Sequence, residues 1–262
     1  MTQYATILDS LPIWVLFVCI VAVVLASIDG GYRLGRYRRR RSEKEKEGPV
    51  GAMVGSTLGL LAFMLAFTFG MASTRFDTRK SLVLDEANAI GTTYLRAAML
   101  PERRDEVRNL LRDYLDTRLE AVRSGRIAEG LARVDDLQAQ LWAHAVSVAQ
   151  QHPDSIVVGL FVEALNEVFD LHAERLAAGL RNRIPGAIWV GLLVLAILSL
   201  ASMGYHSGLV GTSRSLAVIA VAVAFSAVIV LVVDLDRPQE GALKVSQQAL
   251  IDLRQSMTPP AR

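Results

Sequence analysis

Histidine and cysteine, the residues that carry most nucleophilic and metal-dependent chemistry, are few in this chain and far apart. The histidines are His144, His152, His172 and His206, and the single cysteine is Cys19. There is no H-E-x-x-H and no cysteine pair, so a zinc site lacks its usual ligand spacing. There is also no G-x-G-x-x-G, G-x-x-x-x-G-K-[ST] or G-x-S-x-G, the loops that hold phosphates or present a nucleophilic serine. We therefore predict that the protein is not an enzyme and has no catalytic residue, metal or cofactor.

Charged residues of both signs gather where two apolar runs of the sequence end. These boundary residues are Arg75, Asp77, Arg79, Asp85, Glu86, Asp234, Asp236 and Arg237. One interpretation is structural: the groups pair at the water interface and hold helices together. The other is that some of them ring an ion pathway. The residues themselves leave both interpretations open, although the structural one is the more ordinary.

The second apolar run carries a pattern that a pore-lining helix would need. Phe63, Phe67 and Met71 recur every four residues, so they share one helix face and would form a hydrophobic constriction if that helix lined the axis of an oligomer. Small residues on the same run allow close approach of helices in lipid. A packing face explains the same spacing. The candidate pore-lining residues are Gly55, Gly59, Phe63, Phe67, Gly70 and Met71.

The elements that carry these residues are predicted to be membrane helices. Hydrophobic residues make up 52% of the 262, and the mean hydropathy is +0.34, which is too apolar for a water-soluble fold of this size. The apolar residues fall in four runs without an ionised side chain, at Leu11–Ile28, Gly51–Ser73, Pro185–Tyr205 and Ser215–Val233. Each is close to the roughly 20 residues that cross a bilayer. We predict an all-α membrane protein with four transmembrane helices.

A helical extramembrane domain, residues 74–184, is predicted between the second and third crossings. No proline occurs from Gly51 to Leu100, so the second crossing is expected to continue into this domain as one helix and to stop near Pro101. Apolar residues at helical spacing then predict helices over Glu102–Val122, Arg126–Gln151 and onward to Arg183. Ser124 and Gly125 mark the first break, and Asp154 or Ser155 is expected to cap the last helix.

The predicted organisation is therefore residues 1–73, with helices 1 and 2 and a basic loop at 31–49, the domain at 74–184, helices 3 and 4 at 185–234, and a C-terminal tail at 235–262. Eight basic residues in the loop place it in the cytoplasm, in contact with anionic lipid headgroups, and send domain 74–184 to the opposite side. Basic residues at the other helix ends weaken this assignment. Nucleic-acid binding is the alternative for such a basic cluster, but we predict a lipid bilayer as the partner and no nucleic acid.

Four segments of the chain resemble the bacterial bestrophin-like membrane proteins. They are F-T-F-G-M-A-S-T-R-F-D-T-R-K (67–80), D-E-A-N-A-I-G-T-T-Y-L-R-A (85–97), L-N-E-V-F-D-L-H-A-E-R (165–175) and D-L-D-R-P (234–238). The resemblance extends over about Gly51–Leu253. It implies a multi-pass protein of the bacterial inner membrane and, through the remote likeness of this family to true bestrophins, a homo-oligomeric ion channel.

By that analogy the channel would be a pentamer that conducts inorganic ions, with the second crossing around the axis and Phe63, Phe67 and Met71 as its neck. The basic loop predicts one departure from this analogy, because bestrophins keep their large domain in the cytoplasm, whereas domain 74–184 is expected on the opposite side. The alternative is a membrane-anchored scaffold or sensor whose extramembrane helices bind a partner. A transporter is a third option, which the lack of ionisable residues within the apolar runs disfavours.

Overall fold

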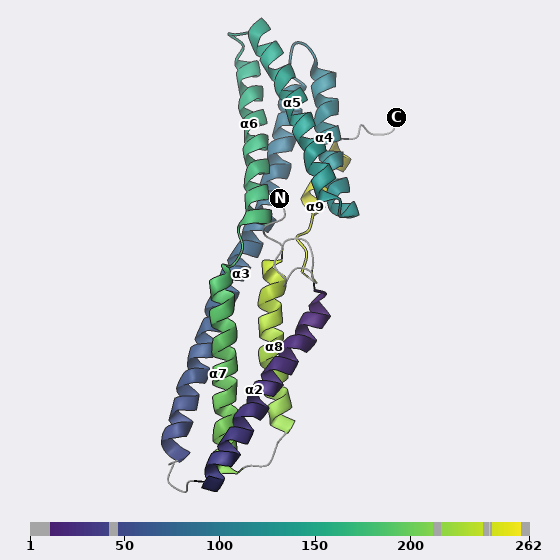
Figure 1. Cartoon of the computed structure of the whole chain (residues 1–262). Coiled ribbons are helices and arrows are strands. Elements are labelled where there is room, and N and C mark those ends of the chain that lie inside the picture. Colours follow the sequence, from purple (N-terminus) through teal and green to yellow (C-terminus); the bar gives the residue numbers. More distant parts are fainter. Residues whose placement is uncertain (1–10, 42–46, 212–215, 238–240, 242, 258–262) are drawn as a thin grey trace. The chain divides into compact units, whose positions relative to one another are not determined.

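The computed structural model describes residues 11–41, 47–211, 216–237, 241 and 243–257, and these residues are helical with short connections (Figure 1). The helices are α2 (Ile13–Arg41), α3 (Glu47–Ala97), α4 (Arg104–Ser124), α5 (Ile127–Gln151), α6 (Ile156–Leu176), the π-helix η1 (Ala177–Arg181), α7 (Gly186–Val210), α8 (Leu216–Asp236) and α9 (Gln248–Ser256). In these ranges α2, α3, α7 and α8 are long and apolar enough to cross a membrane. The predicted all-α, multi-pass fold is confirmed.

The chain divides into two compact units. The membrane unit is Met1–Phe76 with Asn182–Lys244, and the helical domain is Asp77–Arg181 with Val245–Arg262. The end of the chain differs from the predicted C-terminal tail at 235–262, because α9 belongs to the helical domain. Leu250 and Met257 are buried in the core of that domain. On a free tail these apolar side chains would remain in water, so their burial favours the docked position. The partners of these apolar residues lie far away along the chain, so local sequence did not assign the segment after Arg237 to the helical domain.

Close packing of α2 against α7 organises the membrane unit (Figure 1). Each of these helices has two glycines four residues apart, Gly31 and Gly35 on α2, and Gly204 and Gly208 on α7. A Cβ at Gly31 would lie 1.9 Å from the carbonyl oxygen of Ala201, and one at any of the other three would lie 2.1–2.3 Å from a backbone oxygen of the facing helix. Only glycine permits this approach, which brings the backbones of the two helices into direct van der Waals contact.

The predicted basic loop at 31–49 is wrong in its first part, since α2 continues as a helix to Arg41. Two causes act together. Arginine is a good helix former, and Gly31 and Gly35, which would weaken an isolated helix, are buried here against α7. At the other side of this segment, α3 already begins at Glu47. The remainder of the predicted loop, with Lys44 and Lys46, lies outside the described residues.

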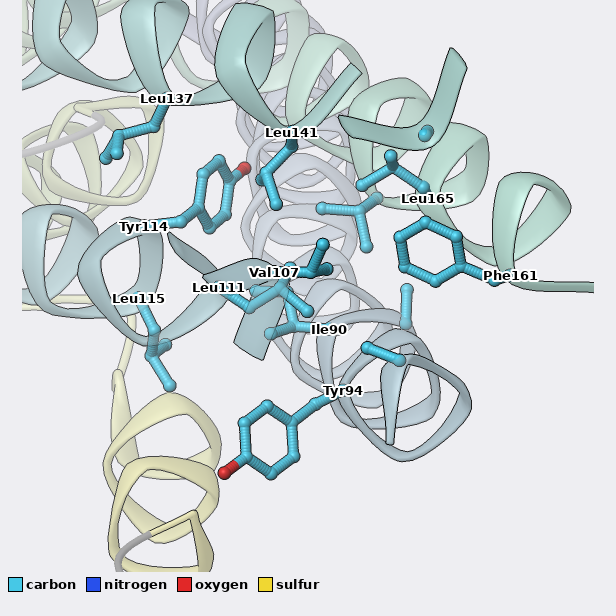
Figure 2. Packing of buried hydrophobic residues seen from close by; sticks show 14 of the residues in the cluster. Ile90, Tyr94, Val107, Leu111, Tyr114, Leu115, Leu137, Leu141, Phe161 and Leu165 are labelled. Carbon is cyan, nitrogen blue, oxygen red and sulfur yellow. The ribbon is translucent and has the colours of Figure 1, made fainter. Parts of the chain in front are cut away.

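The core of the helical domain is built from the C-terminal half of α3 and from α4, α5, α6 and α9 (Figure 2). It forms because each helix turns one apolar stripe inward and exposes most of its charged residues. Figure 2 shows Ile90 and Tyr94 of α3 together with Leu111 and Tyr114 of α4, and with Leu141 and Phe161 of α5 and α6. Phe161, Leu165 and Tyr114 are fully buried.

Local sequence signals place the helix ends of this domain correctly. The predicted continuous helix from the second crossing is confirmed, since α3 has 51 residues and ends at Ala97, just before Pro101. Gly125 ends α4 in the left-handed conformation with φ 73°, which a glycine adopts without strain. Ser155 is the N-cap of α6, and its side-chain oxygen accepts a hydrogen bond from the Val158 N–H.

Candidate functional site

One face of α3 within the membrane unit has no partner among the residues that the structure describes. Phe63 and Phe67 are 65% and 54% exposed, although phenylalanine is usually among the more buried residues. On the other side of the helix, Leu61 and Leu65 are buried against α7 and α8. Helical periodicity of 100° per residue separates these two sets, so α3 has an inner face and an outer face.

The glycines predicted on the second crossing lie on the outer face as well. Gly55, Gly59 and Gly70 are exposed, and a Cβ at any of them would meet nothing within 4 Å. Their small size therefore serves no contact within the described part of the chain, in contrast to the glycines between α2 and α7. Met71 differs from the other candidates, because it is only half-exposed.

The boundary charges at the C-terminal end of α8 make contacts that hold the membrane unit together. Asp234, Asp236 and Arg237 are all buried. Asp234 accepts a hydrogen bond from the Leu243 N–H at 3.1 Å, and Asp236 accepts one from the Ile184 N–H, also at 3.1 Å. Arg237 donates to a backbone oxygen of residue 11 at 2.8 Å. These contacts support the structural interpretation for this group, because buried charges need such partners.

The boundary charges that follow the apolar part of α3 are divided between its faces. Asp77 and Asp85 are exposed, Arg75 is half-buried, and Arg79 and Glu86 are buried. The predicted charged residues of α3 therefore do not share one face of that helix. Asp77 and Asp85 are the carboxylates among them that remain available to solvent or to another chain.

Glu86 is the centre of a buried charge cluster in the helical domain, which we call the Glu86 cluster. Its carboxylate accepts hydrogen bonds from Arg118 of α4 at 3.2 Å, from Arg175 of α6, and from the Tyr114 hydroxyl at 3.1 Å. Arg175 also donates to Gln247 at 3.2 Å. The cluster thus joins three helices and the segment before α9 through one fully buried carboxylate.

The electrostatics of the Glu86 cluster keep its carboxylate charged. Burial alone would raise the pKa of Glu86, but the guanidinium groups of Arg118 and Arg175 outweigh it, so this pKa is lowered. Burial and the neighbouring Glu86 charge raise the pKa of Tyr114, which therefore remains a neutral donor. Burial lowers the pKa of His172 to about 4, and neither ring nitrogen of this buried residue has a hydrogen-bond partner.

Sequence reasoning named Glu86 but missed Tyr114, Arg118 and Arg175 as its partners. A signal was present, because Glu86 follows Val83 by three residues and precedes Ile90 by four, which places it on the apolar stripe of α3. The arginine partners come from helices 32 and 89 residues away and could not be read from local spacing.

The side chains of the described residues do not assemble a metal site: no three His, Cys, Asp or Glu among them lie close enough to hold an ion. Within the described residues, the Glu86 cluster does not pair a nucleophile with a base, because neither ring nitrogen of His172 forms a hydrogen bond. The chemistry that it offers is charge stabilisation within the fold. Whether the protein is an enzyme is not tested by these observations and stays a prediction.

Comparison with known proteins identifies the family. The family model of the bestrophin-like domain matches residues 16–250, which covers α2 to the start of α9 and therefore both units. No curated protein matches the chain, and no solved structure matches it. The matched range includes the outer face of α3, the Glu86 cluster and the boundary residues at the end of α8. The chain belongs to the bestrophin-like family.

Proposed function

We propose that the protein is a homo-oligomeric ion channel in which the outer face of α3 from each copy lines a shared pore. The observation that carries this proposal is that the outer face of α3 holds two exposed phenylalanines and three glycines at which a Cβ would meet no atom of the described chain within 4 Å. Membership of the bestrophin-like family supports it through the distant relation of that family to bestrophin channels.

An oligomer is part of the proposal for a physical reason. Four helices packed around their own apolar side chains leave little room for an aqueous path, as Leu61 and Leu192 show at 0% and 1% exposure. A pore between copies needs a helix whose face is unused within each copy, and α3 has one. Five copies is the number expected by analogy with bestrophins. The rings of Phe63 and Phe67 would then form the hydrophobic constriction that controls wetting of the pore.

Two exposed phenylalanines of α3 allow a matched test in planar lipid bilayers. We expect the purified protein to carry current, and Phe67→Ala to raise the unitary conductance because one ring per copy is removed from the constriction. Phe69 is 39% exposed but lies about 160° around the helix from Phe67. Phe69→Ala should therefore leave the conductance within experimental error of the wild type.

Silent bilayers across salts, voltages and calcium concentrations would argue against a channel. Equal changes from Phe67→Ala and Phe69→Ala would instead remove α3 from the pore axis. The orientation in the membrane, the bacterial inner membrane as location and the absence of enzyme activity remain predictions beside this proposal.

A scaffold or sensor role is the second candidate, and one surface favours it. The helical domain has an apolar groove of about 310 Å³ lined by Trp142, Ala145, Val146, Ala149, Gln150 and Val162. Trp142 is 41% exposed there, and buried aromatic anchors dominate many protein interfaces. One variant distinguishes the two roles. Trp142→Ala should abolish partner binding by a scaffold and leave the current of a channel unchanged.

A further inference from the structure

The end of α2 extends well beyond the apolar span of that helix. With 29 residues α2 is longer than the roughly 20 residues that cross the hydrocarbon core. Its apolar stretch ends at Ile28, and the remaining turns to Arg41 rise by about 20 Å at 1.5 Å per residue. This part of the helix therefore passes through the headgroup layer, which is several ångströms thick on each side of a bilayer.

The contact with α7 fixes which side of this projecting segment faces outward. Gly31 and Gly35 press against backbone atoms of α7, so the opposite side of α2 is turned away from it. At 100° per residue, Arg33, Arg36 and Arg40 all fall within about 60° of that opposite side. All three are exposed. We call these residues the arginine face.

Other arginines of the segment have roles within the protein and are not part of the arginine face. Arg39 lies over the C-terminal end of α7, where its guanidinium occupies the space beside Gly211, and a cation is favourable at the negative end of a helix dipole. Arg41 lies over the ring of Tyr37 at 4.8 Å. Within the described part of α2, Asp29 forms an ion pair with Arg33 at 2.7 Å, and three arginines against this carboxylate leave a net positive charge on the arginine face.

We propose that the arginine face binds the phosphate groups of anionic phospholipids. Two observations indicate this partner. The headgroup layer must surround a helix that leaves the bilayer at this point, and the positive charge of the arginine face is complementary to anionic headgroups. Arginine recognises phosphate through a planar fork of donors, and its long side chain can reach back along the helix to the phosphate level. The exposed Leu34 and Tyr37 beside the arginines suit the boundary between headgroups and acyl chains.

The test is native mass spectrometry of the full-length protein in detergent, titrated separately with phosphatidylglycerol and phosphatidylcholine. One basic residue near a membrane surface changes anionic lipid affinity by about a factor of five. We expect wild-type protein to prefer phosphatidylglycerol, and the variant Arg33→Gln/Arg36→Gln/Arg40→Gln to lose on the order of a hundred-fold of that preference. Arg36→Gln alone should lose about five-fold, which keeps the test valid if the triple variant misfolds.

A control variant with the same change in net charge separates a local surface from overall charge. Arg104, Arg123 and Arg133 are exposed on the helical domain, and replacing all three by Gln should preserve the lipid preference. An equal loss in this control would overturn the proposal, as would equal binding of the two lipids by wild-type protein. Binding of a thymidine oligonucleotide that the arginine-face variant abolishes, while phosphatidylglycerol preference persists, would assign the surface to nucleic acid instead.

Discussion

Removing the charge of Glu86 should destabilise the helical domain strongly. The carboxylate is fully buried, and the side chains of Arg118 and Arg175 are only 12% and 13% exposed. In Glu86→Gln both guanidinium groups remain buried without a counter-charge. Breaking a buried ion pair by removing one partner costs about 3–5 kcal/mol, and a second arginine here adds to the imbalance. We expect a loss in this range in the free energy of unfolding.

Urea unfolding in detergent micelles, followed by tryptophan emission, measures this loss. Trp142 of α5 contacts Phe169 of α6 with ring centroids 6.4 Å apart, so its emission reports the packing of the helical domain. Trp14 and Trp189 are replaced by phenylalanine in all variants, which leaves one reporter. Asp85→Asn is the matched control, because Asp85 is the neighbour of Glu86 on α3 but is exposed. A surface carboxylate contributes about 1 kcal/mol at most.

A second substitution tests the electrostatic reasoning itself. If uncompensated charge is the cause, Arg175→Gln in the Glu86→Gln background should recover part of the stability, because one stranded cation is removed. A Glu86→Gln loss no larger than that of Asp85→Asn would refute the account. Additive losses in the double variant would also refute it, since they would mean that the two residues contribute independently.

Two further predictions concern His172 and the glycines of α2. Because His172 has a pKa of about 4 when folded and about 6.5 when unfolded, the unfolded chain binds its proton first, so stability should fall by about 2–3 kcal/mol as the pH decreases from 6.5 to 4. His172→Gln should remove this part of the slope in Trp142-monitored unfolding. Gly31→Val should prevent recovery of folded protein by size-exclusion chromatography, whereas Gly30→Val should be recovered normally, because a Cβ at Gly30 meets nothing within 4 Å.

The parts of the fold that follow from local sequence could be predicted. Apolar runs of membrane length identified the crossing helices, and Pro101, Gly125 and Ser155 marked helix ends because each acts through its own backbone or side chain. The extension of α2 was missed because six arginines were interpreted by their charge and not by their helix propensity.

Features that depend on distant contacts were harder to predict. The glycine spacing of Gly31 and Gly35 was visible in the sequence, but nothing local indicates that its partner is α7. The outer face of α3 was expected from the spacing of Phe63 and Phe67, and both are exposed. Their role in a pore stays a prediction, since the atoms that would complete it belong to other copies of the chain.

The glycine contact between α2 and α7 has a consequence for biosynthesis. Gly204 leaves the ribosome about 170 residues after Gly35, which corresponds to roughly 8–35 s at 5–20 residues per second. During that interval the glycine stripe of α2, Gly31 and Gly35, lacks its final neighbour. The residues of the helical domain up to η1 are all synthesised before the partner helix exists. Assembly of the membrane unit must therefore finish late, after most of the water-exposed helices have already been translated.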